Sequence, residues 1–464
     1  MRTEEVHTLI IGAGPAGLAA AYKLAKGGVL PILLEKDRVV GGMMRSIRRN
    51  QFILDIGRKE LYSRIHEVDR LWAEILGSDY RPYLHRVGIL YDGHIFEMSR
   101  TYRGWRRGMP WSILLACGVD YLWCRARSGA SKPLHYQDYS YRTRGRRFSQ
   151  VLSQEFEEKF SGKKWVAMPP PEGVTDGCDK GFSQSVIGRL GRAFRKDTPE
   201  PNWRHPLRGS GQICELLEKK ILESGGRFHF GVRVTDLIAA CGRIRAVRAE
   251  IDSEQVTYWP SHVVSSIQLE ALAELLFPLR PKAAGRHSLT EDPPRRSTVL
   301  VYLFITEPPR FPHAWLNVTC PKTRAGRITN YAAFNGDMVP GGYTCLCVEY
   351  FCTGMDILLT RCNNELQQLA TEECVRSRLV DPAKISDCLV LKLPGGDAAV
   401  HPRDWLSQTR SHLLAELNQF YNLYYVNRAG TDLATYAGLE AATAILSGDR
   451  SRFDQQADPT FSAW

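Results

Sequence analysis

The chain has 464 residues, of which 44% are hydrophobic and 24% are charged, and its formal net charge is +11. This composition is ordinary for a globular protein and excludes an intrinsically disordered chain. The length exceeds what one hydrophobic core usually supports, so two or three lobes are expected.

The cysteines and the N-terminal residues indicate a reducing compartment. The twelve cysteines contain no C-x-x-C pair and no spacing typical of a metal site. We therefore expect unpaired, mostly buried thiols and no metal. The first six residues contain no apolar stretch of the kind found in a secretory signal. A cytoplasmic location is the expectation.

The N-terminal segment has the pattern of a strand, a glycine turn and a helix. The apolar run 9–11 enters a turn with glycines at positions 12, 14 and 17, and a helix-competent stretch follows at 18–26. A second apolar run, 30–34, ends in Glu35. This order and spacing are the fingerprint of a dinucleotide-binding unit.

Each part of this fingerprint has a physical task. Gly12 permits a tight turn, Gly14 allows the backbone to approach a pyrophosphate, and Gly17 allows the helix to pack closely on the strand. The helix N-terminus offers unpaired N–H groups to the phosphates. Glu35 can accept hydrogen bonds from a ribose diol.

A second glycine turn follows at Gly41 and Gly42, and Arg45 is placed to donate to phosphate oxygens. The run 35–57 resembles the "E…GG…R…G…D.G" continuation of flavoproteins in the superfamily of protoporphyrinogen oxidase, monoamine oxidase and UDP-galactopyranose mutase. The resemblance implies that the ligand is FAD. It places the second glycine turn and Arg45 near the diphosphate and ribityl chain, and Gly57 beside the flavin ring.

The residues after Gly57 depart from the family. Relatives often have Gly-His in this loop, whereas this chain has Arg58, Lys59 and Glu60. Cations at the flavin face would favour an anionic reduced flavin or an anionic substrate. Alternatively the loop lies away from the flavin, with Lys59 at the surface. Arg58 and Lys59 are therefore candidates near flavin or substrate, and the catalytic residues are unknown.

Residues 66–76 have apolar side chains at helical spacing, and 88–96 form a hairpin with Asp-Gly at its turn. The most apolar segment is 111–124, and it lies in a basic block. Between positions 100 and 147 there are ten Arg and one Lys against two Asp. The block has no nucleic-acid motif, so no nucleic acid is expected; an anionic substrate, an acidic membrane surface or a solvated face remain.

Fourteen apolar residues are too few to span a bilayer, which needs about 20. One interpretation of 111–124 is a buried or cavity-lining helix. The other is an interfacial helix, with peripheral membrane contact through 105–127 and access for a lipid-linked substrate.

The middle of the chain returns to the first domain. Residues 148–171 resemble the helix and "K.W…P" loop of the superfamily's helical insertion, and the Arg- and Pro-rich run 191–206 is interpreted as a linker. A helix at 213–222 and strands at 228–234, 244–249 and 259–266 follow. In relatives the strand matching 232–234 lies against the adenine, which implies that Val234 contacts FAD.

Three further strands, at 297–306, 326–331 and 343–350, predict a mixed or antiparallel sheet in a substrate lobe. The run that begins at Arg327 resembles a strand of eukaryotic-type UDP-galactopyranose mutases, in which the arginine contacts a substrate diphosphate. The alternative is a structural ion-pair residue.

Near the C-terminus a strand at 423–427 enters a glycine turn and a small-residue helix at 433–446. It resembles the "GR.G…G..AA" segment that closes over the ribityl diphosphate and the flavin edge, with Asn427 in place of the usual Gly. Fingerprint and resemblance together assign to FAD the residues Gly12, Gly14, Pro15, Ala16, Gly17, Glu35, Lys36, Gly41, Gly42, Met43, Arg45, Gly57, Val234, Arg428, Gly430, Thr431 and Asp432.

The predicted fold is α/β, with a discontinuous Rossmann-type FAD-binding domain and a substrate domain of mixed β-sheet with a helical insertion. The FAD-binding domain is expected to comprise 1–75, 207–275 and 406–464. The substrate domain is expected to comprise 76–206 and 276–405.

These features predict an FAD-dependent oxidoreductase. Hydride would pass to flavin N5 from a polar, anionic small molecule such as a sugar derivative or biosynthetic intermediate. One alternative is a redox-neutral mutase-like isomerase, in which reduced FAD attacks a sugar anomeric carbon. Another is a non-catalytic flavoprotein scaffold. A homodimer is compatible with the sequence.

Overall fold

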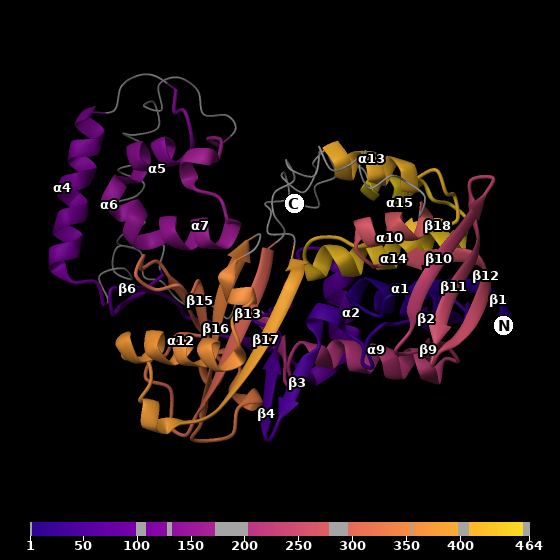
Figure 1. Cartoon of the computed structure of the whole chain (residues 1–464), viewed down its shortest axis with the longest axis horizontal. Coiled ribbons are helices and arrows are strands. Elements are labelled where there is room, and N and C mark those ends of the chain that lie inside the picture. The colour runs from indigo at the N-terminus through magenta and orange to yellow at the C-terminus, as the bar shows by residue number, and fades with distance from the viewer. Residues whose placement is uncertain are drawn as a thin grey trace. The chain divides into compact units, whose positions relative to one another are not determined.

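The computed structural model describes residues 2–98, 108–127, 132–171, 203–277, 296–353, 356–397 and 408–457. The chain forms two compact units, and both are discontinuous in sequence (Figure 1). The first unit consists of Met1–Pro82, Trp203–Pro293 and Val400–Trp464. The second unit consists of Tyr83–Asn202 and Pro294–Ala399.

The first unit is built on a seven-stranded sheet with the order β10-β11-β12-β1-β2-β9, and β18 also pairs with β12. β1 is parallel to β2 and β12, β12 is parallel to β18, and β10, β11 and β12 are antiparallel. The strands are β1 (Arg2–Ile11), β2 (Pro31–Leu34), β9 (Arg227–His229), β10 (Arg233–Ala240), β11 (Arg243–Ile251), β12 (Glu254–Ser265) and β18 (Leu423–Tyr425).

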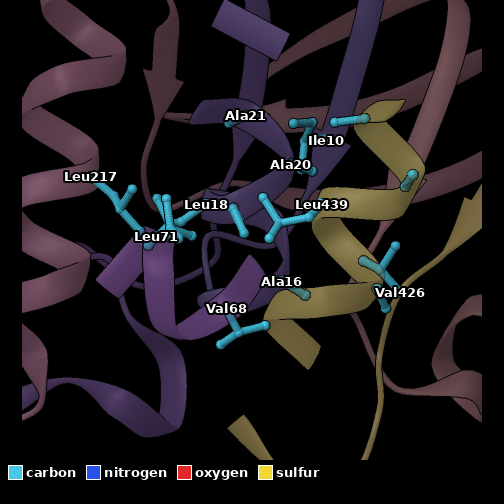
Figure 2. Close-up of a cluster of buried hydrophobic side chains, with 14 of the residues drawn as sticks. Ile10, Ala16, Leu18, Ala20, Ala21, Val68, Leu71, Leu217, Val426 and Leu439 are labelled. Carbon is cyan, nitrogen blue, oxygen red and sulfur yellow. The ribbon is translucent and has the colours of Figure 1, made fainter. Parts of the chain in front are cut away.

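Both faces of this sheet are covered at the end of β1, where the consecutive apolar residues Leu9, Ile10 and Ile11 are all buried. Ile10 belongs to one buried cluster, and its neighbours Leu9 and Ile11 belong to another on the opposite face. Figure 2 shows the Ile10 cluster, in which side chains of α1, α2, α9 and α14 meet.

The helices of the first unit are α1 (Pro15–Lys26), α2 (His66–Leu76), α9 (Gly211–Glu223), α10 (Leu269–Leu276), α13 (Gln408–Leu417), α14 (Thr431–Ser447) and α15 (Ser451–Ala457), with short 3-10 turns η1 (Gly42–Met44) and η2 (Gly77–Asp79).

Two small two-stranded sheets complete the first unit. β3 (Ser46–Arg49) pairs with β4 (Phe52–Asp55), and β5 (Tyr80–Tyr83) pairs with β8 (Trp203–Pro206). The β5–β8 pair changes two predictions. Residues 203–206 of the predicted linker form a strand, whereas 191–202 lie outside the described residues. Residues 76–82, predicted for the substrate domain, belong to the first unit.

Close packing of α14 on α1 requires Gly438. A Cβ atom at Gly438 would overlap the carbonyl oxygen of Ala16, which is backbone and has little freedom to move. We expect Gly438→Ala to lower the free energy of unfolding by about 1–3 kcal/mol, although alanine is the better helix former. Thermal unfolding checks this, with Gly118→Ala as the control. Gly118 also lies within a helix, but its Cβ would meet open space. Equal melting temperatures for both variants would contradict the packing argument.

The second unit is built on a seven-stranded mixed sheet with the order β17-β13-β16-β15-β14-β6-β7. Only β14 and β6 pair in parallel; the other neighbours are antiparallel. Its strands are β6 (Val87–Tyr91), β7 (His94–Glu97), β13 (Arg296–Ile305), β14 (Trp315–Val318), β15 (Arg327–Asn330), β16 (Thr344–Thr353) and β17 (Ile385–Asp397). The predicted α/β fold, a Rossmann-type domain with a mixed-sheet domain, is confirmed.

Helices cover this sheet and form an insertion. The insertion contains α4 (Trp111–Arg127), α5 (Tyr136–Arg144), α6 (Arg146–Ser149), the π-helical turn η3 (Gln150–Gln154), α7 (Glu155–Ser161) and η4 (Trp165–Ala167). The other helices are α11 (Tyr331–Phe334), η5 (Gly336–Met338), η6 (Ile357–Leu359), α12 (Asn363–Arg376) and η7 (Pro382–Lys384).

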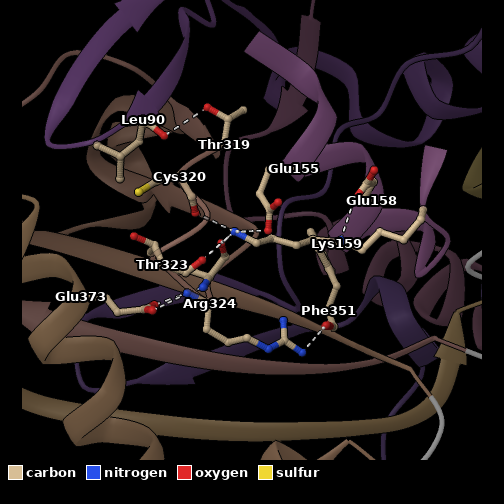
Figure 3. Close-up of polar contacts among 12 residues, drawn as sticks. Leu90, Glu155, Glu158, Lys159, Thr319, Cys320, Thr323, Arg324, Phe351 and Glu373 are labelled. Atoms are coloured by element: carbon tan, nitrogen blue, oxygen red, sulfur yellow. Dashed lines mark hydrogen bonds and ion pairs between the residues drawn. The ribbon is translucent and has the colours of Figure 1, made fainter. Parts of the chain in front are cut away.

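A buried lysine ties the insertion to the sheet (Figure 3). The Lys159 amine of α7 donates hydrogen bonds to the carbonyl oxygens of Cys320 at 3.1 Å and Thr323 at 2.6 Å. From the other side of this loop, the Glu373 carboxylate of α12 accepts from the N–H of Ala325 at 3.1 Å. The loop before β15 is therefore held by charged partners on two helices.

Several local predictions can be compared with these elements. The predicted hairpin turn has positive φ at Asp92 (48°) and Gly93 (77°), as a two-residue turn requires. The predicted strand 228–234 is instead two strands, separated by Gly231 with φ 68°. Among the described residues the cysteines form no disulfide, and no three His, Cys, Asp or Glu side chains could share a metal.

Candidate cofactor site

The carboxyl ends of β1, β12 and β18 bring the predicted FAD segments together. Ser266, after β12, donates its backbone N–H to Ile11 at the end of β1 (2.9 Å). The Asn427 amide, after β18, donates to the carbonyl of Ser266 at 3.1 Å. In open sheets with parallel strands, ligands bind beyond this edge. Asn427, which departs from the family's glycine, ties the C-terminal turn to the sheet.

The three fingerprint glycines have different physical roles. Gly12 has φ 96°, and a Cβ atom at Gly17 would overlap the Gly12 carbonyl oxygen, so the fold itself needs both. Gly14 has φ −77°, which any residue can adopt, and a Cβ there would find no atom within 4 Å. The open space over Gly14 fits the approach of a pyrophosphate. Pro15 and Ala16 follow as the first residues of α1.

Glu35 is buried and oriented by backbone donors. Its Oε2 accepts from the N–H of Ala13 at 2.7 Å, and its Oε1 accepts from the N–H of Asp37 at 2.9 Å. Each carboxylate oxygen can accept a second hydrogen bond, which suits a ribose diol. The neighbouring Lys36 is exposed.

The second glycine turn lies directly against the first. Gly41, with φ 103°, donates its N–H to the carbonyl of Ala13 at 2.8 Å, and a Cβ at Gly42 would lie 3.6 Å from the Cα of Gly14. Met43 lies within this turn and is half-buried. Arg45 forms an ion pair with Asp37 at 2.6 Å, in which both side chains are partly exposed. The predicted phosphate-binding arginine therefore has a carboxylate partner.

The C-terminal segment reaches the same turn through α14. Gly430 has φ 95° and precedes α14, and the Thr431 hydroxyl contacts the sulfur of Met44 at 3.4 Å. The Arg428 guanidinium donates to the carbonyls of Tyr425 and Asn427, so it is turned toward its own segment.

Asp432 carries a buried carboxylate oxygen that is suited to a ligand hydroxyl. The residue is 8% exposed, and Oδ2 receives no hydrogen bond from the residues that the structure describes. Burial raises the pKa of the Asp432 carboxyl above its ordinary value. An unsatisfied buried acceptor costs about 1–3 kcal/mol. A hydroxyl group of the FAD ribityl chain would remove that cost, so this residue fits the predicted cofactor.

This predicts that Asp432→Asn separates stability from cofactor binding. An acid whose pKa is higher in the folded state than in the unfolded state takes up a proton on folding. Its ionised form therefore lowers the free energy of unfolding, and this loss grows as the pH rises from the unfolded-state pKa to the folded-state pKa. At neutral pH the cofactor-free variant should unfold at the same temperature as the wild type or higher, and this difference should vanish below the carboxyl range. Its FAD affinity should fall about tenfold, because a charged acceptor is lost. Lower stability at neutral pH with unchanged affinity would contradict the assignment.

The remaining FAD candidates lie around β10 and after β4. Val234 lies in β10 with a half-buried side chain, and the N–H of Val232 donates to the carbonyl of Glu35 at 2.9 Å. Gly57 is buried with φ 69°. These contacts place the start of β10 beside the Glu35 end of β2.

The loop after Gly57 contains its own counter-charge. The Arg58 guanidinium lies 3.2 Å from the Glu60 carboxylate, and Lys59 is half-buried. Because Glu60 offsets the charge of Arg58, the three residues together carry a net charge of +1.

A buried polar cluster, which the sequence did not reveal, connects the elements around the site. Asp55 and His205 are both fully buried, and their side chains meet at 2.9 Å. Asp55 also accepts from the Ser46 hydroxyl at 2.7 Å and from the N–H of Ser210 at 2.8 Å. The cluster joins β4, β3, β8 and the start of α9. The only sequence signal was the aspartate of the "D.G" motif, since His205 and Ser210 are 150 and 155 positions away.

Arg327 lies inside the second unit. It is 9% exposed, and its guanidinium is 3.3 Å from the Glu349 carboxylate and 5.6–5.7 Å from the ring centres of Phe156, Phe160 and Phe351. This is the geometry of a structural ion pair with aromatic neighbours. A substrate contact by Arg327 stays a prediction.

The second unit also contains a cavity of about 520 Å³. Charged residues dominate its lining, with six cations and three carboxylates: Lys159, Lys163, Lys164, Lys322, Arg324 and Arg376, and Glu155, Glu158 and Glu373. Lys159 pairs with Glu155, and Lys164 pairs with Glu158. The lining therefore has a positive excess.

Comparisons with known proteins agree with this geometry. Residues 10–74 match the family model of the NAD(P)-binding Rossmann-like domain. The chain is 23% identical to 4,4'-diapophytoene desaturase (4,4'-diapolycopene-forming) of Methylomonas sp over 346 residues, 66% of this chain and 62% of the relative. It is 42% identical to protoporphyrinogen oxidase 2 of Arabidopsis thaliana over 66 residues, 14% of this chain and 13% of that protein. The matches thus span less than two thirds of either relative.

Solved structures show the same fold over nearly the whole chain. Reduced UDP-galactopyranose mutase superposes with a TM-score of 0.76 at 17% identity, covering 98% of each chain. Putrescine oxidase bound to putrescine superposes with a TM-score of 0.58 at 12% identity, covering 96% of this chain and all of the other. The N-terminal matches and the whole-chain similarity of fold agree with the FAD-dependent oxidoreductase superfamily that includes protoporphyrinogen oxidase, flavin amine oxidase and UDP-galactopyranose mutase, and with FAD as the cofactor.

Proposed function

We propose that the protein is an FAD-dependent oxidoreductase that removes hydride from a polar, anionic small molecule, such as a sugar derivative or a biosynthetic intermediate. The observation that carries the proposal is the convergence of Gly14, Glu35 and Asp432 beyond the carboxyl edge of one sheet. When bound, FAD supplies the hydride acceptor.

The chain's own contribution is to hold and orient the cofactor. The open backbone at Gly14 and the first N–H groups of α1 suit the diphosphate. Glu35 is oriented by two backbone donors and would accept from ribose hydroxyls, and the buried Oδ2 of Asp432 would accept from a hydroxyl of the ribityl chain. The N-terminus of α14 would offer a partial positive charge to the flavin edge at which negative charge develops during reduction.

The anionic character of the substrate is supported by the charge of the second unit. Its cavity has six cations against three carboxylates in the lining. A lining with an excess of Lys and Arg favours phosphate or carboxylate groups over neutral ones.

One alternative has support of its own. A redox-neutral, mutase-like isomerase that uses reduced FAD is favoured by the whole-chain similarity to reduced UDP-galactopyranose mutase, with a TM-score of 0.76. The predicted substrate contact of Arg327 belongs to this alternative.

Anaerobic mixing distinguishes the two activities. The purified flavoprotein is mixed without oxygen with a panel of sugar nucleotides, sugar phosphates and organic acids, and flavin absorbance is followed. Bleaching by one compound, with formation of its oxidised product, is the expected result. Turnover only after dithionite reduction, with a product isomeric to the substrate, would establish the isomerase instead. Turnover of a compound while the flavin stays oxidised throughout would contradict both proposed activities.

A further inference from the structure

Helix α4 of the second unit carries an apolar stripe on its exposed face. Five large apolar side chains of this helix are between 58% and 71% exposed: Trp111, Leu115, Val119, Leu122 and Trp123. At about 100° per residue they fall within an arc of about 120°. Exposed apolar residues are normal when they are scattered, but a continuous stripe of two Trp, two Leu and one Val indicates a contact surface.

The opposite face of α4 is packed, so the orientation of the stripe is fixed. Ile113 and Leu114 lie against a buried cluster that includes Phe96 and Val151, and Cys117 is buried. The prediction that 111–124 forms a buried or cavity-lining helix is therefore correct for one face only. The helix has apolar residues on both faces, so the sequence pattern did not indicate which face is exposed.

A hydrogen bond in the middle of the helix adds to this orientation. The Asp120 carboxylate accepts the N–H of Arg147 at 2.7 Å, which holds α4 against α6. In Figure 1 α5 and α6 lie on one side of α4. The packed and exposed faces are thus distinct, and the stripe is a property of the folded unit.

A cation lies at the C-terminal end of the stripe, and the insertion as a whole has an excess of positive charge. Residues 108–149 contain seven Lys and Arg and two Asp. Asp120 accepts the backbone N–H of Arg147, and Asp138 forms an ion pair with Arg142 at 2.7 Å. The guanidinium of Arg127 lies 4.1 Å from the ring centre of Trp123, at the end of the stripe. The other exposed cations nearby in sequence are Lys132, Arg144, Arg146 and Arg147.

An apolar stripe with an arginine at its end, on an insertion with an excess of positive charge, is complementary to an anionic lipid bilayer. The apolar side chains enter the acyl boundary, Trp favours the headgroup level, and Arg and Lys attract the anionic headgroups. The helix cannot span the bilayer, because 17 residues reach about 25 Å against about 30 Å of hydrocarbon. In keeping with this, no helix in the described part of the chain is long and apolar enough to cross a membrane.

We propose that α4 docks the protein on an anionic membrane surface, with Trp111, Leu115, Val119, Leu122 and Trp123 inserted in the interface and the helix axis in its plane. This goes beyond the proposed reaction, because the surface belongs to the insertion and contains none of the cofactor-site residues. The docking is therefore independent of which substrate the enzyme oxidises.

Vesicle sedimentation of the flavin-loaded protein tests the docking. The wild type is centrifuged with vesicles of phosphatidylcholine mixed with phosphatidylglycerol and with vesicles of phosphatidylcholine alone. The test variant is Leu115→Gln with Leu122→Gln. The matched control is Leu30→Gln with Leu222→Gln, which makes the same changes at two exposed leucines of the first unit. A flavin spectrum equal to that of the wild type checks that each variant is folded.

The wild type and the control should bind the anionic vesicles, less so as salt is raised, and should bind neutral vesicles more weakly. The test variant should lose about tenfold or more in the partition coefficient. Equal binding by the test variant, or absence of the wild type from both pellets, would overturn the proposal. Dissociation of a wild-type dimer by the test substitutions, without any vesicle binding by the wild type, would do so too, because a second copy would then cover the stripe.

Discussion

Gly14→Ala is expected to lower FAD affinity about 100-fold or more, roughly 3 kcal/mol, while the cofactor-free protein folds as before. Gly14 has a backbone conformation that alanine adopts freely, and a Cβ atom there meets nothing within 4 Å. The added methyl group would occupy the space through which the pyrophosphate approaches the backbone. Equilibrium titration of the cofactor-free protein with FAD measures the loss.

A matched control makes this test specific. Gly341→Ala introduces the same methyl group into open space in the second unit. It should change neither FAD affinity nor melting temperature. Gly17→Ala is the contrasting change, because its Cβ would overlap the Gly12 carbonyl, and it should lower the stability of the cofactor-free chain. If Gly14→Ala bound FAD as tightly as the control, the diphosphate would not lie over this turn.

Asp55→Ala is expected to lower the free energy of unfolding of the first unit by about 3–5 kcal/mol, because it leaves a buried partner uncompensated. The carboxylate accepts from Ser46, His205 and Ser210, and each is left without this acceptor. Thermal unfolding of the cofactor-free protein checks the loss.

The control for Asp55 is an exposed ion pair between the same elements. Arg48 of β3 and Glu215 of α9 lie 3.2 Å apart, and both are about half exposed. Glu215→Ala should cost no more than about 1 kcal/mol. A cost at Asp55 as small as the cost at Glu215 would contradict the view that the buried cluster holds these elements together.

Local features of the fold were predictable because a short stretch of sequence decides them. The strand, turn and helix at positions 9–26 follow from apolar periodicity and three glycines, and the hairpin turn follows from Asp92 and Gly93. Fold class, superfamily and cofactor followed from these segments together with the family resemblance. The break between β9 and β10 at Gly231 was missed, because a single glycine between apolar residues does not by itself predict that one strand ends and another begins.

Side-chain partners far apart in sequence were not predictable. Nothing in the residues around Asp55 indicates His205, and nothing around Arg327 indicates that Glu349 and three phenylalanine rings surround it. Such pairings depend on which elements the tertiary fold brings together, and the local sequence does not determine this.

The central claim is that the first unit holds one FAD per chain, and the direct test is to identify what the purified protein binds. The protein is denatured, and the released nucleotide is identified and quantified by absorbance and mass spectrometry, with FAD, FMN and NAD(P) as standards. We expect FAD near one equivalent per chain, either as purified or after incubation with added FAD. A folded wild type that releases no flavin and binds no added FAD, or that takes up NAD(P) in its place, would contradict the account.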